Sequence, residues 1–308
     1  MKVNSKVWAA LLAVYLVWGS TYLGIRFAVE TIPPFFHAAV RFLIAGAFLF
    51  TWRRLAGDPA PTRGQWKSAA IVGALLLVGG NGLISLSEVN LPSGVAALIV
   101  ASIPMFMVLV EALRPGGAKP GPWQLLGLLI GFGGVALLIG PAEFGSGARQ
   151  FSLVSGGIAL LAALLWAIGS IYNRSADLPA STLLFTGMEM LAGSLGLFLV
   201  SGLLGEFGRV DLAAISTRSL LGLLYLITFG SLVGFTSYAW LLRNAPVSLV
   251  STYPYVNPIV AVLLGNWLAH ETLNGRILLA AGIIVGAVVL TNRGKKPVPP
   301  APEPEEIV

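Results

Sequence analysis

Long apolar stretches separated by short polar connections dominate the sequence. Each stretch has about 20 mostly apolar residues, the length an α-helix needs to cross a bilayer. Apolar residues follow one another without the strict alternation of membrane β-strands, so a β-barrel is excluded. The pattern predicts an all-α integral membrane protein with ten transmembrane helices. The predicted spans are Val7–Phe27, Phe35–Trp52, Trp66–Leu86, Ser93–Leu113, Trp123–Ile139, Leu153–Asn173, Ser181–Leu203, Ser219–Leu242, Val247–His270 and Arg276–Asn292.

Charge adds an orientation to this pattern. The 308 residues are 56% hydrophobic and 10% charged, far below the roughly 25% charged residues of soluble domains. Thirteen of the 19 lysines and arginines lie in the predicted inner connections, five in the outer ones, and Arg41 lies within a span. Cytoplasmic loops carry such an excess, so both termini are predicted to be cytoplasmic. Because the basic residues lie at helix ends, a nucleic-acid partner is not expected.

Two proline-broken apolar segments organise the chain as a repeat. Moved back by 154 positions, Pro246 and Pro258 fall on Pro92 and Pro104, and a shift of 148 places Trp18 on another tryptophan, at position 166. Each half then has five helices, an odd number, so the second half enters the membrane from the opposite side. The sequence predicts two inverted five-helix repeats, whose corresponding broken segments point to a transporter's binding site.

The predicted division places the first repeat at 1–140 and the second at 153–293. An outer loop at 141–152 joins them. The remaining 294–308 is rich in proline and glutamate, and such a segment is expected to be an extended, disordered cytoplasmic tail.

Charged residues within the spans are candidate functional groups, because each is costly in the bilayer. Arg41 and Glu189 correspond under the 148 shift, and both are predicted near the midplane. Arg41 would anchor a substrate carboxylate. Glu189 would be a proton-coupling acid or would bind a substrate amine. The alternative is structural: a buried pair of Arg41 with Glu189, or of Arg41 with Glu30 or Glu88.

Helix breaks and aromatic side chains complete the predicted cavity. Prolines at positions 104 and 258 free backbone carbonyls, which side chains, water or substrate must satisfy in lipid. Mid-span aromatic rings can stack on a substrate or bind a cation, although kinks and aromatic residues also serve ordinary packing. The predicted substrate-binding residues are Trp18, Tyr22, Arg41, Asn81, Ser102, Pro104, Trp166, Glu189, Tyr238, Ser251, Tyr253, Tyr255, Asn257 and Pro258.

Signatures of catalysis are missing from the sequence. It has no cysteine and only two histidines, and neither histidine stands in a metal-ligand pattern. It contains neither a phosphate-binding loop nor a nucleophile elbow. We therefore expect no enzyme activity, cofactor or metal.

Several short motifs carry a resemblance to a known family. Val17-Trp18-Gly19-Ser20, Arg41-Phe42-Leu43-Ile44-Ala45 and His270-Glu271-Thr272-Leu273, together with the two prolines, resemble the EamA type of the drug/metabolite transporter superfamily. The resemblance covers roughly Val7 to Asn292 and implies a ten-helix exporter of small metabolites in the bacterial inner membrane. The first repeat departs from it, because Arg114-Pro115-Gly116-Gly117 stands where the second has the His270-Glu271 turn.

The combined interpretation is a secondary transporter that works by alternating access around a central cavity between the repeats. A small zwitterion such as an amino acid, a related amphipathic compound or a drug is the expected substrate. The chain is expected to be a monomer or a homodimer in the lipid bilayer, with proton coupling one option. Two alternatives remain: a lipid-carrier flippase, which predicts a lateral opening with an apolar groove, and a non-catalytic membrane scaffold subunit.

Overall fold

The computed structural model describes residues 5–139, 153–245, 247–250 and 252–293. The predicted loop 141–152, the tail 294–308 and the predicted site residue Ser251 lie outside these residues. Within them all regular structure is helical. The elements are α1 (Ser5–Ala28), α2 (Pro34–Leu55), α3 (Arg63–Val72), η1 (Gly73–Gly82), α4 (Leu83–Glu88), α5 (Ser93–Val100), α6 (Ile103–Leu113), α7 (Pro122–Ile139), α8 (Leu153–Asn173), α9 (Thr182–Leu203), η3 (Phe207–Arg209), α10 (Thr217–Tyr225), η4 (Leu226–Val233), α11 (Gly234–Asn244), α12 (Val247–Val250), α13 (Tyr253–Ala269) and α14 (Gly275–Arg293).

Eight helical stretches in the described residues are long and apolar enough to cross a membrane. They include the composite rods α3–η1–α4, α5–α6 and α10–η4–α11. The last two predicted spans are not among these eight stretches. A break separates α12 from α13, and the apolar part of α14, Gly275–Thr291, is shorter than the eight stretches. The all-helical membrane fold is thus confirmed with eight candidate spans.

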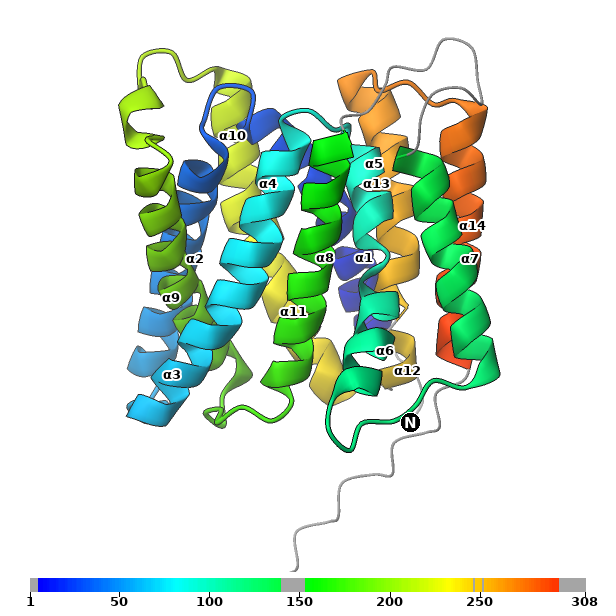
Figure 1. Ribbon diagram of the computed structural model, residues 1–308. Helices are drawn as coiled ribbons and strands as arrows, with labels where there is room; N and C mark the ends of the chain where they lie inside the picture. Colours follow the sequence, from blue (N-terminus) through cyan, green and yellow to red (C-terminus); the bar gives the residue numbers. More distant parts are fainter. Residues whose placement is uncertain (1–4, 140–152, 246, 251, 294–308) are drawn as a thin grey trace, which may run out of the picture.

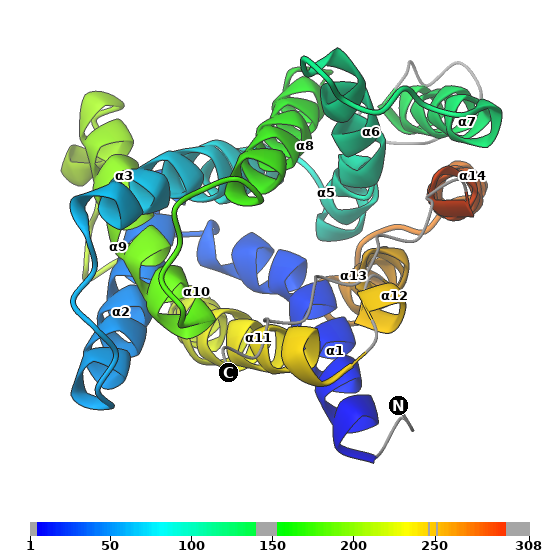
Figure 2. The same cartoon turned by 90° about the horizontal axis from the view of Figure 1, so that it is seen from below.

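The rods stand side by side, and the described connections between successive rods lie alternately at the upper and lower ends of the bundle (Figure 1). Seen along the bundle, α2 lies along α9, α7 lies beside α14, and α1 runs between α11 and α13 (Figure 2). Small residues permit the closest of these contacts. A Cβ added to Gly187 of α9 would lie 2.7 Å from the Phe50 backbone nitrogen of α2.

Element boundaries recur at the offsets seen in the sequence. The helices α8 and α9 begin 148 residues after α1 and α2, and α10 and α12 begin 154 residues after α3 and α5. Helix α14 begins 153 residues after α7. Each composite third rod also contains a π-helical segment, η1 or η4. In Figure 1, α1 starts at the lower end of the bundle and α8 at the upper end.

Acidic side chains clamp both ends of the contact between α2 and α9. Glu206, which follows α9 and is 1% exposed, accepts hydrogen bonds from the backbone nitrogens of Phe35 (3.4 Å) and Phe36 (2.8 Å) in the first turn of α2. At the other end of α2, Arg53 donates two bonds of 2.8 and 2.7 Å to Asp58. Hydrogen bonds from Arg53 and then from Ser181 hold the pKa of Asp58 below its usual range.

Candidate functional site

Four aromatic side chains from three elements form a cluster where α1 meets α11 and α13. The ring centroid of Trp18 lies 5.4 Å from Phe235, 5.1 Å from Tyr238 and 5.1 Å from Tyr253. The two tyrosine rings lie 5.7 Å apart. These edge-to-face and tilted pairs are the favourable geometries for aromatic contacts. We call these four residues the aromatic cluster; three of them are predicted site residues.

Trp18 reaches this position because the opposing rod carries glycines. Its indole nitrogen donates to the main-chain oxygen of Gly230 in η4, at 3.3 Å. A Cβ added to Gly234 would lie 2.4 Å from the same nitrogen, so a side chain there would displace the indole. The π-helical segment and its following glycine therefore accommodate Trp18.

Arg41 approaches the same segment from α2. Its Nε donates to the Ser231 hydroxyl at 3.0 Å, and a Cβ on Gly230 would lie 3.1 Å from its Nη2. The guanidinium also lies 4.7 Å from the centroid of its neighbour Phe42. Arg41 is 4% exposed and makes no ion pair within the described residues. A buried cation with unused donors and the indole of Trp18 thus converge on Gly230.

The structure does not join Arg41 to Glu189. Contacts of Gly46 with Leu191 and of Gly187 with Phe50 place Glu189 level with about Ala47 of α2. At 1.5 Å per residue, that is about 9 Å along the axis from Arg41. Glu189 is 6% exposed, and none of the contacts among the described residues gives its carboxyl a partner.

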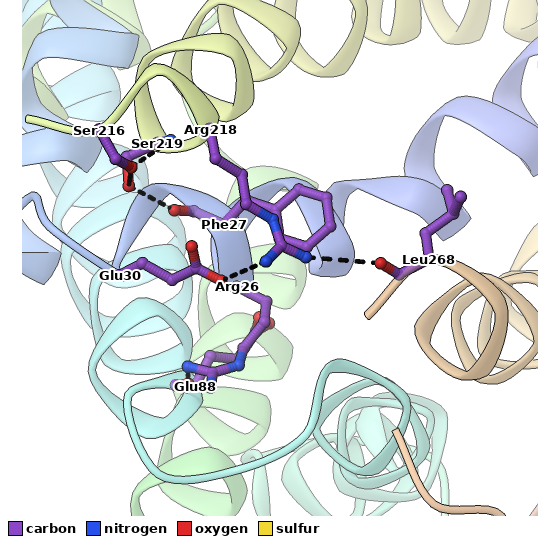
Figure 3. A network of polar contacts seen from close by, with 8 residues as sticks. All are labelled: Arg26, Phe27, Glu30, Glu88, Ser216, Arg218, Ser219 and Leu268. Carbon is purple, nitrogen blue, oxygen red and sulfur yellow. Dashed lines mark hydrogen bonds and ion pairs between the residues drawn. The ribbon is translucent and has the colours of Figure 1, made fainter. Parts of the chain in front are cut away.

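Neither of the other two acids considered as partners for Arg41 is bound to it. Glu30 pairs with Arg218 at 3.4 Å, as Figure 3 shows. Arg218 also stacks on Phe27, with its Cζ 3.9 Å from the ring centroid. The carboxyl group of Glu88 has no hydrogen-bond partner in the described residues. The structural alternative for Arg41 therefore finds no acidic partner in this part of the chain.

Both predicted helix breaks occur, and a hydroxyl group bonds a carbonyl at each. Ser102 donates to the oxygen of Ile99 at 2.6 Å between α5 and α6, and Thr252 donates to Leu249 at 2.5 Å between α12 and α13. The breaks precede the prolines rather than coincide with them. Pro104 lies in the first turn of α6, while Pro258 lies inside α13.

Polar contacts fasten the second break to α1. The Tyr15 hydroxyl is hydrogen bonded to that of Thr252. With its amide oriented as a donor, Asn257 bonds the main-chain oxygens of Tyr253 (3.1 Å) and Tyr15 (3.3 Å). Gly19 allows this approach, since a Cβ there would lie 2.6 Å from the Cβ of Val260. The break therefore lies directly beside the aromatic cluster.

The remaining predicted residues lie elsewhere. Tyr22 and Tyr255 pack against a different apolar core, formed mainly by α5, α7 and α14. Trp166 of α8 faces η1, where a Cβ on Gly80 would lie 2.6 Å from its ring. Asn81 donates to Leu76 within its own rod at 3.5 Å. The 14 predicted residues thus do not form one cluster.

The sequence does not predict Phe235, Ser231, Gly230 or Gly234 as site residues. The sequence contains part of a signal, because tryptophan recurs at positions 18 and 166 and glycine at positions 80 and 234; the contact between them comes from the structure. Trp166 lies on Gly80 in one half, and the offsets of 148 and 154 convert this pair into Trp18 and Gly234. The two offsets together predict that α8 packs on η1 and that α1 packs on the rod containing η4, so the first rod of each half contacts the third rod of the other half.

A separate groove of about 380 Å³ opens between α1, α10 and α13. Its polar feature is a 2.5 Å hydrogen bond between the hydroxyls of Ser20 and Tyr225. Apolar side chains form the rest of the wall. The lining residues are Leu16, Val17, Ser20, Tyr225, Val260, Leu263 and Leu264.

Apolar helices that expose leucine and phenylalanine outward and bury Arg41 inward define an integral membrane protein with several spans. The chain also matches the EamA-like transporter family over residues 5–140 and 156–293. It therefore belongs to the EamA-like transporter family, and the resemblance to the drug/metabolite transporter superfamily is confirmed.

Individual relatives match over nearly the whole chain. It is 39% identical over 298 residues to the "Uncharacterized inner membrane transporter YedA" of Escherichia coli (strain K12), covering 96% of this chain and 94% of the relative. It is 28% identical to the "Uncharacterized transporter YvbV" of Bacillus subtilis (strain 168), covering 96% and 95%. One solved crystal structure superposes with a TM-score of 0.61 at 21% identity, covering 94% and 98% of the two chains, which shows a shared fold.

Proposed function

We propose that the protein is a secondary transporter that exports small amphipathic metabolites carrying a carboxylate, such as amino acids, across the inner membrane. The observation that supports this most is the convergence of Arg41 and Trp18 on Gly230 of η4. A cation without an acidic partner would bind an anionic group, and the adjacent rings would receive an apolar or cationic one. An inner-membrane location is supported by the name of the relative YedA.

Arg41 supplies the anchor for the anionic end of the substrate. Its Nε is engaged by Ser231, which orients the guanidinium, while the terminal nitrogens keep their donors. Charge-assisted bonds from a planar guanidinium to a carboxylate are among the stronger hydrogen bonds. In a water-poor interior, the same charge would exclude substrates that carry only a positive charge.

The aromatic cluster supplies the other end of the site. The faces of Trp18, Tyr238 and Tyr253 attract an amine through cation–π contact and an apolar side chain through dispersion. Glu189 is proposed as the coupling acid or as a second ligand for an amine, because it lies buried on α9 without a partner in the described residues.

The proposed mechanism is alternating access between two inverted halves. Ten helices with both termini in the cytoplasm are proposed, with α12–α13 and α14 completing the eight longer spans. Support comes from the offsets of 148, 153 and 154 between element starts and from the opposite entry of α1 and α8. The break between α12 and α13 lies beside the aromatic cluster, and inverted-repeat transporters form their binding sites at such discontinuous helices.

Transport by purified protein in liposomes tests the proposal. Counterflow of labelled phenylalanine and of the organic cation tetraphenylphosphonium is measured with the parent chain and with Arg41→Gln. We expect uptake of the amino acid, strongly reduced by Arg41→Gln. Arg218→Gln, which alters a cation at the bundle end, should leave uptake unchanged. Movement of the cation but not of the amino acid, or no movement of either, would contradict the proposal.

A lipid-carrier flippase is the second candidate, and the lateral groove favours it. The groove at α1, α10 and α13 is apolar apart from Ser20 and Tyr225, as expected for acyl chains. Scrambling of a fluorescent lipid in the same liposomes separates the candidates. If the groove carries lipid, replacing Leu263 by Trp should block lipid scrambling. If the groove has no role in transport, the same change should leave amino-acid counterflow unchanged.

A further inference from the structure

Glu88, the last residue of α4, is a buried acid that Arg41 and the aromatic cluster leave unexplained. It is 0% exposed, and neither carboxyl oxygen has a hydrogen-bond partner in the described residues. An ionised carboxylate held in this way loses its hydration without compensation, which is unfavourable. A protonated carboxyl avoids most of that penalty, so this position suits a group that binds a proton.

Arg26 lies beside Glu88 but does not neutralise its carboxyl group through a direct bond. The Nη1 of Arg26 donates to the main-chain oxygen of Glu88 at 3.2 Å (Figure 3). The charges that act on the Glu88 carboxyl are those of Glu271 and Arg26. Tyr22, about one turn before Arg26 on α1, is the other titratable group near Glu88 on this helix.

The other elements packed on α4 add little charge. The segments α8, η1 and α5 contain no acidic or basic residue. Helix α2 carries His37, whose ring is buried with both nitrogens unpartnered in the described part of the chain, and Arg41, which is bonded to Ser231. Arg26 and Glu271 are therefore the charged groups that the proposal has to consider first, with Arg41 farther along α2.

Glu271 is the second acid, and it fastens α13 to α5. Its two carboxylate oxygens accept hydrogen bonds from the backbone nitrogens of Ser93 (2.7 Å) and Gly94 (3.1 Å). Gly265 leaves room for this carboxylate, since a Cβ there would lie 2.4 Å from Oε2. Residues 89–92 connect Glu88 to the start of α5. Glu88 and the Glu271 carboxylate therefore lie at the same end of the bundle, which we call the Glu271 end.

We propose that Glu88 is a proton-binding site, and that its protonation allows Glu271 to keep α5 and α13 together at the Glu271 end. When Glu88 is ionised, a second negative charge stands near Glu271, and like charges in a poorly solvated site repel strongly. The arrangement in which Glu271 holds α5 and α13 together then becomes less favourable. This inference rests on the proposed alternating access, to which it adds a coupling ion and a residue other than Glu189.

The sequence offers a clean way to test the proposal, because it contains no cysteine. Cysteines are introduced at Asn90 and Thr272 and carry spin labels. Both positions are exposed, and they lie on the two sides of the contact that Glu271 makes with the start of α5. Distances between the labels are measured from pH 8 to pH 5 in liposomes. We expect the short-distance population to grow as the pH falls, because protonation removes the repulsion.

Variants assign this response to one carboxyl group. Glu88→Gln mimics the protonated acid, so it should show the short distance at every pH. Glu88→Asp keeps a titrating group and should respond with a shifted midpoint. Glu111→Gln, a change of an acid in α6 outside the proposed substrate site, should respond like the parent. A pH curve for Glu88→Gln or Glu88→Asp that superposes on the parent curve, or a parent without any pH response, would overturn the proposal.

A second label pair separates this inference from the proposed transport mechanism. Cysteines at Arg114 and Asn244 report on the opposite end of the bundle, where both positions are exposed. Reciprocal distance changes at the two ends support alternating access. If the Glu271 end responds to pH through Glu88 while the opposite end stays fixed, the proton site stands and alternating access fails.

Discussion

Trp18 and Gly230 are joined by a hydrogen bond from the indole nitrogen to the main-chain oxygen, 212 residues apart in the chain. Arg41 reaches the same glycine from another helix. A π-helical segment leaves its carbonyls less regularly paired than an α-helix does, and such segments are frequent at functional sites. Gly230 is therefore the point at which the cationic and aromatic parts of the proposed site meet.

Gly234→Ala should destabilise the protein. The new Cβ would lie 2.4 Å from the Trp18 indole nitrogen, and overpacking of this kind costs about 1–3 kcal/mol. Alanine gains only about 1 kcal/mol over glycine in a helix. Thermal unfolding in detergent measures the difference. Gly282→Ala is the matched control, because nothing lies within 4 Å of its added Cβ. An equal effect of both substitutions would show that Trp18 does not require Gly234.

Ser231→Ala should weaken substrate binding more than it weakens folding. The hydroxyl orients Arg41 through a 3.0 Å bond to Nε, and hydrogen bonds to charged groups contribute about 1.5–3 kcal/mol. Affinity for a carboxylate substrate, followed by ligand-induced thermal stabilisation, should fall about tenfold or more. Ser194→Ala, which removes a hydroxyl bonded within its own helix, should leave affinity intact. Comparable losses in both variants would argue against an orienting role for Ser231.

Glu206→Ala should lower stability by about 1–3 kcal/mol, because two backbone nitrogens at the start of α2 lose a charged acceptor. The carboxylate is buried against Phe35 and Phe36. Unfolding temperature is the measurement, with Asp211→Ala as the control. That residue caps an exposed backbone nitrogen at Ala213. A stability loss no larger than that of the control would show that Glu206 is dispensable for α2.

Asp58 should make stability depend on pH in the acid range. Its pKa is lowered in the folded chain by Arg53 and Ser181, so its contribution is fully present above the unfolded value of about 3.9. The contribution is lost as the pH falls through the lower folded value. Unfolding temperatures of the parent and Asp58→Asn, compared from pH 6 to pH 3, should differ most at pH 6 and converge in acid. A constant difference would contradict this assignment.

Much of the helical organisation could be predicted from hydropathy, because lipid forces backbone groups to pair within each helix. The predicted span 93–113 matches α5 and α6 at both ends, including the break near Pro104. The π-helical segments could not be predicted. In a glycine-rich apolar run such as Gly73–Gly82, no residue indicates whether the backbone forms α-helical or π-helical hydrogen bonds.

The candidate site was harder to predict than the spans. Residue type and depth predict Arg41, Trp18, Tyr238 and Tyr253, and the structure brings them to one region of η4 and α13. The same grounds predict Tyr22 and Tyr255, which face another core. Depth in a helix does not define which side faces a neighbour, because that depends on packing against helices distant in sequence.

The π-helical turns also allow a change of register. If η4 rewound as α-helix by one residue, everything beyond it would turn by about 100° around the rod axis. Phe235 and Tyr238 would then turn away from Trp18. A local exchange of backbone hydrogen bonds would thus open or close the aromatic cluster, with Gly230 and Gly234 as its pivots.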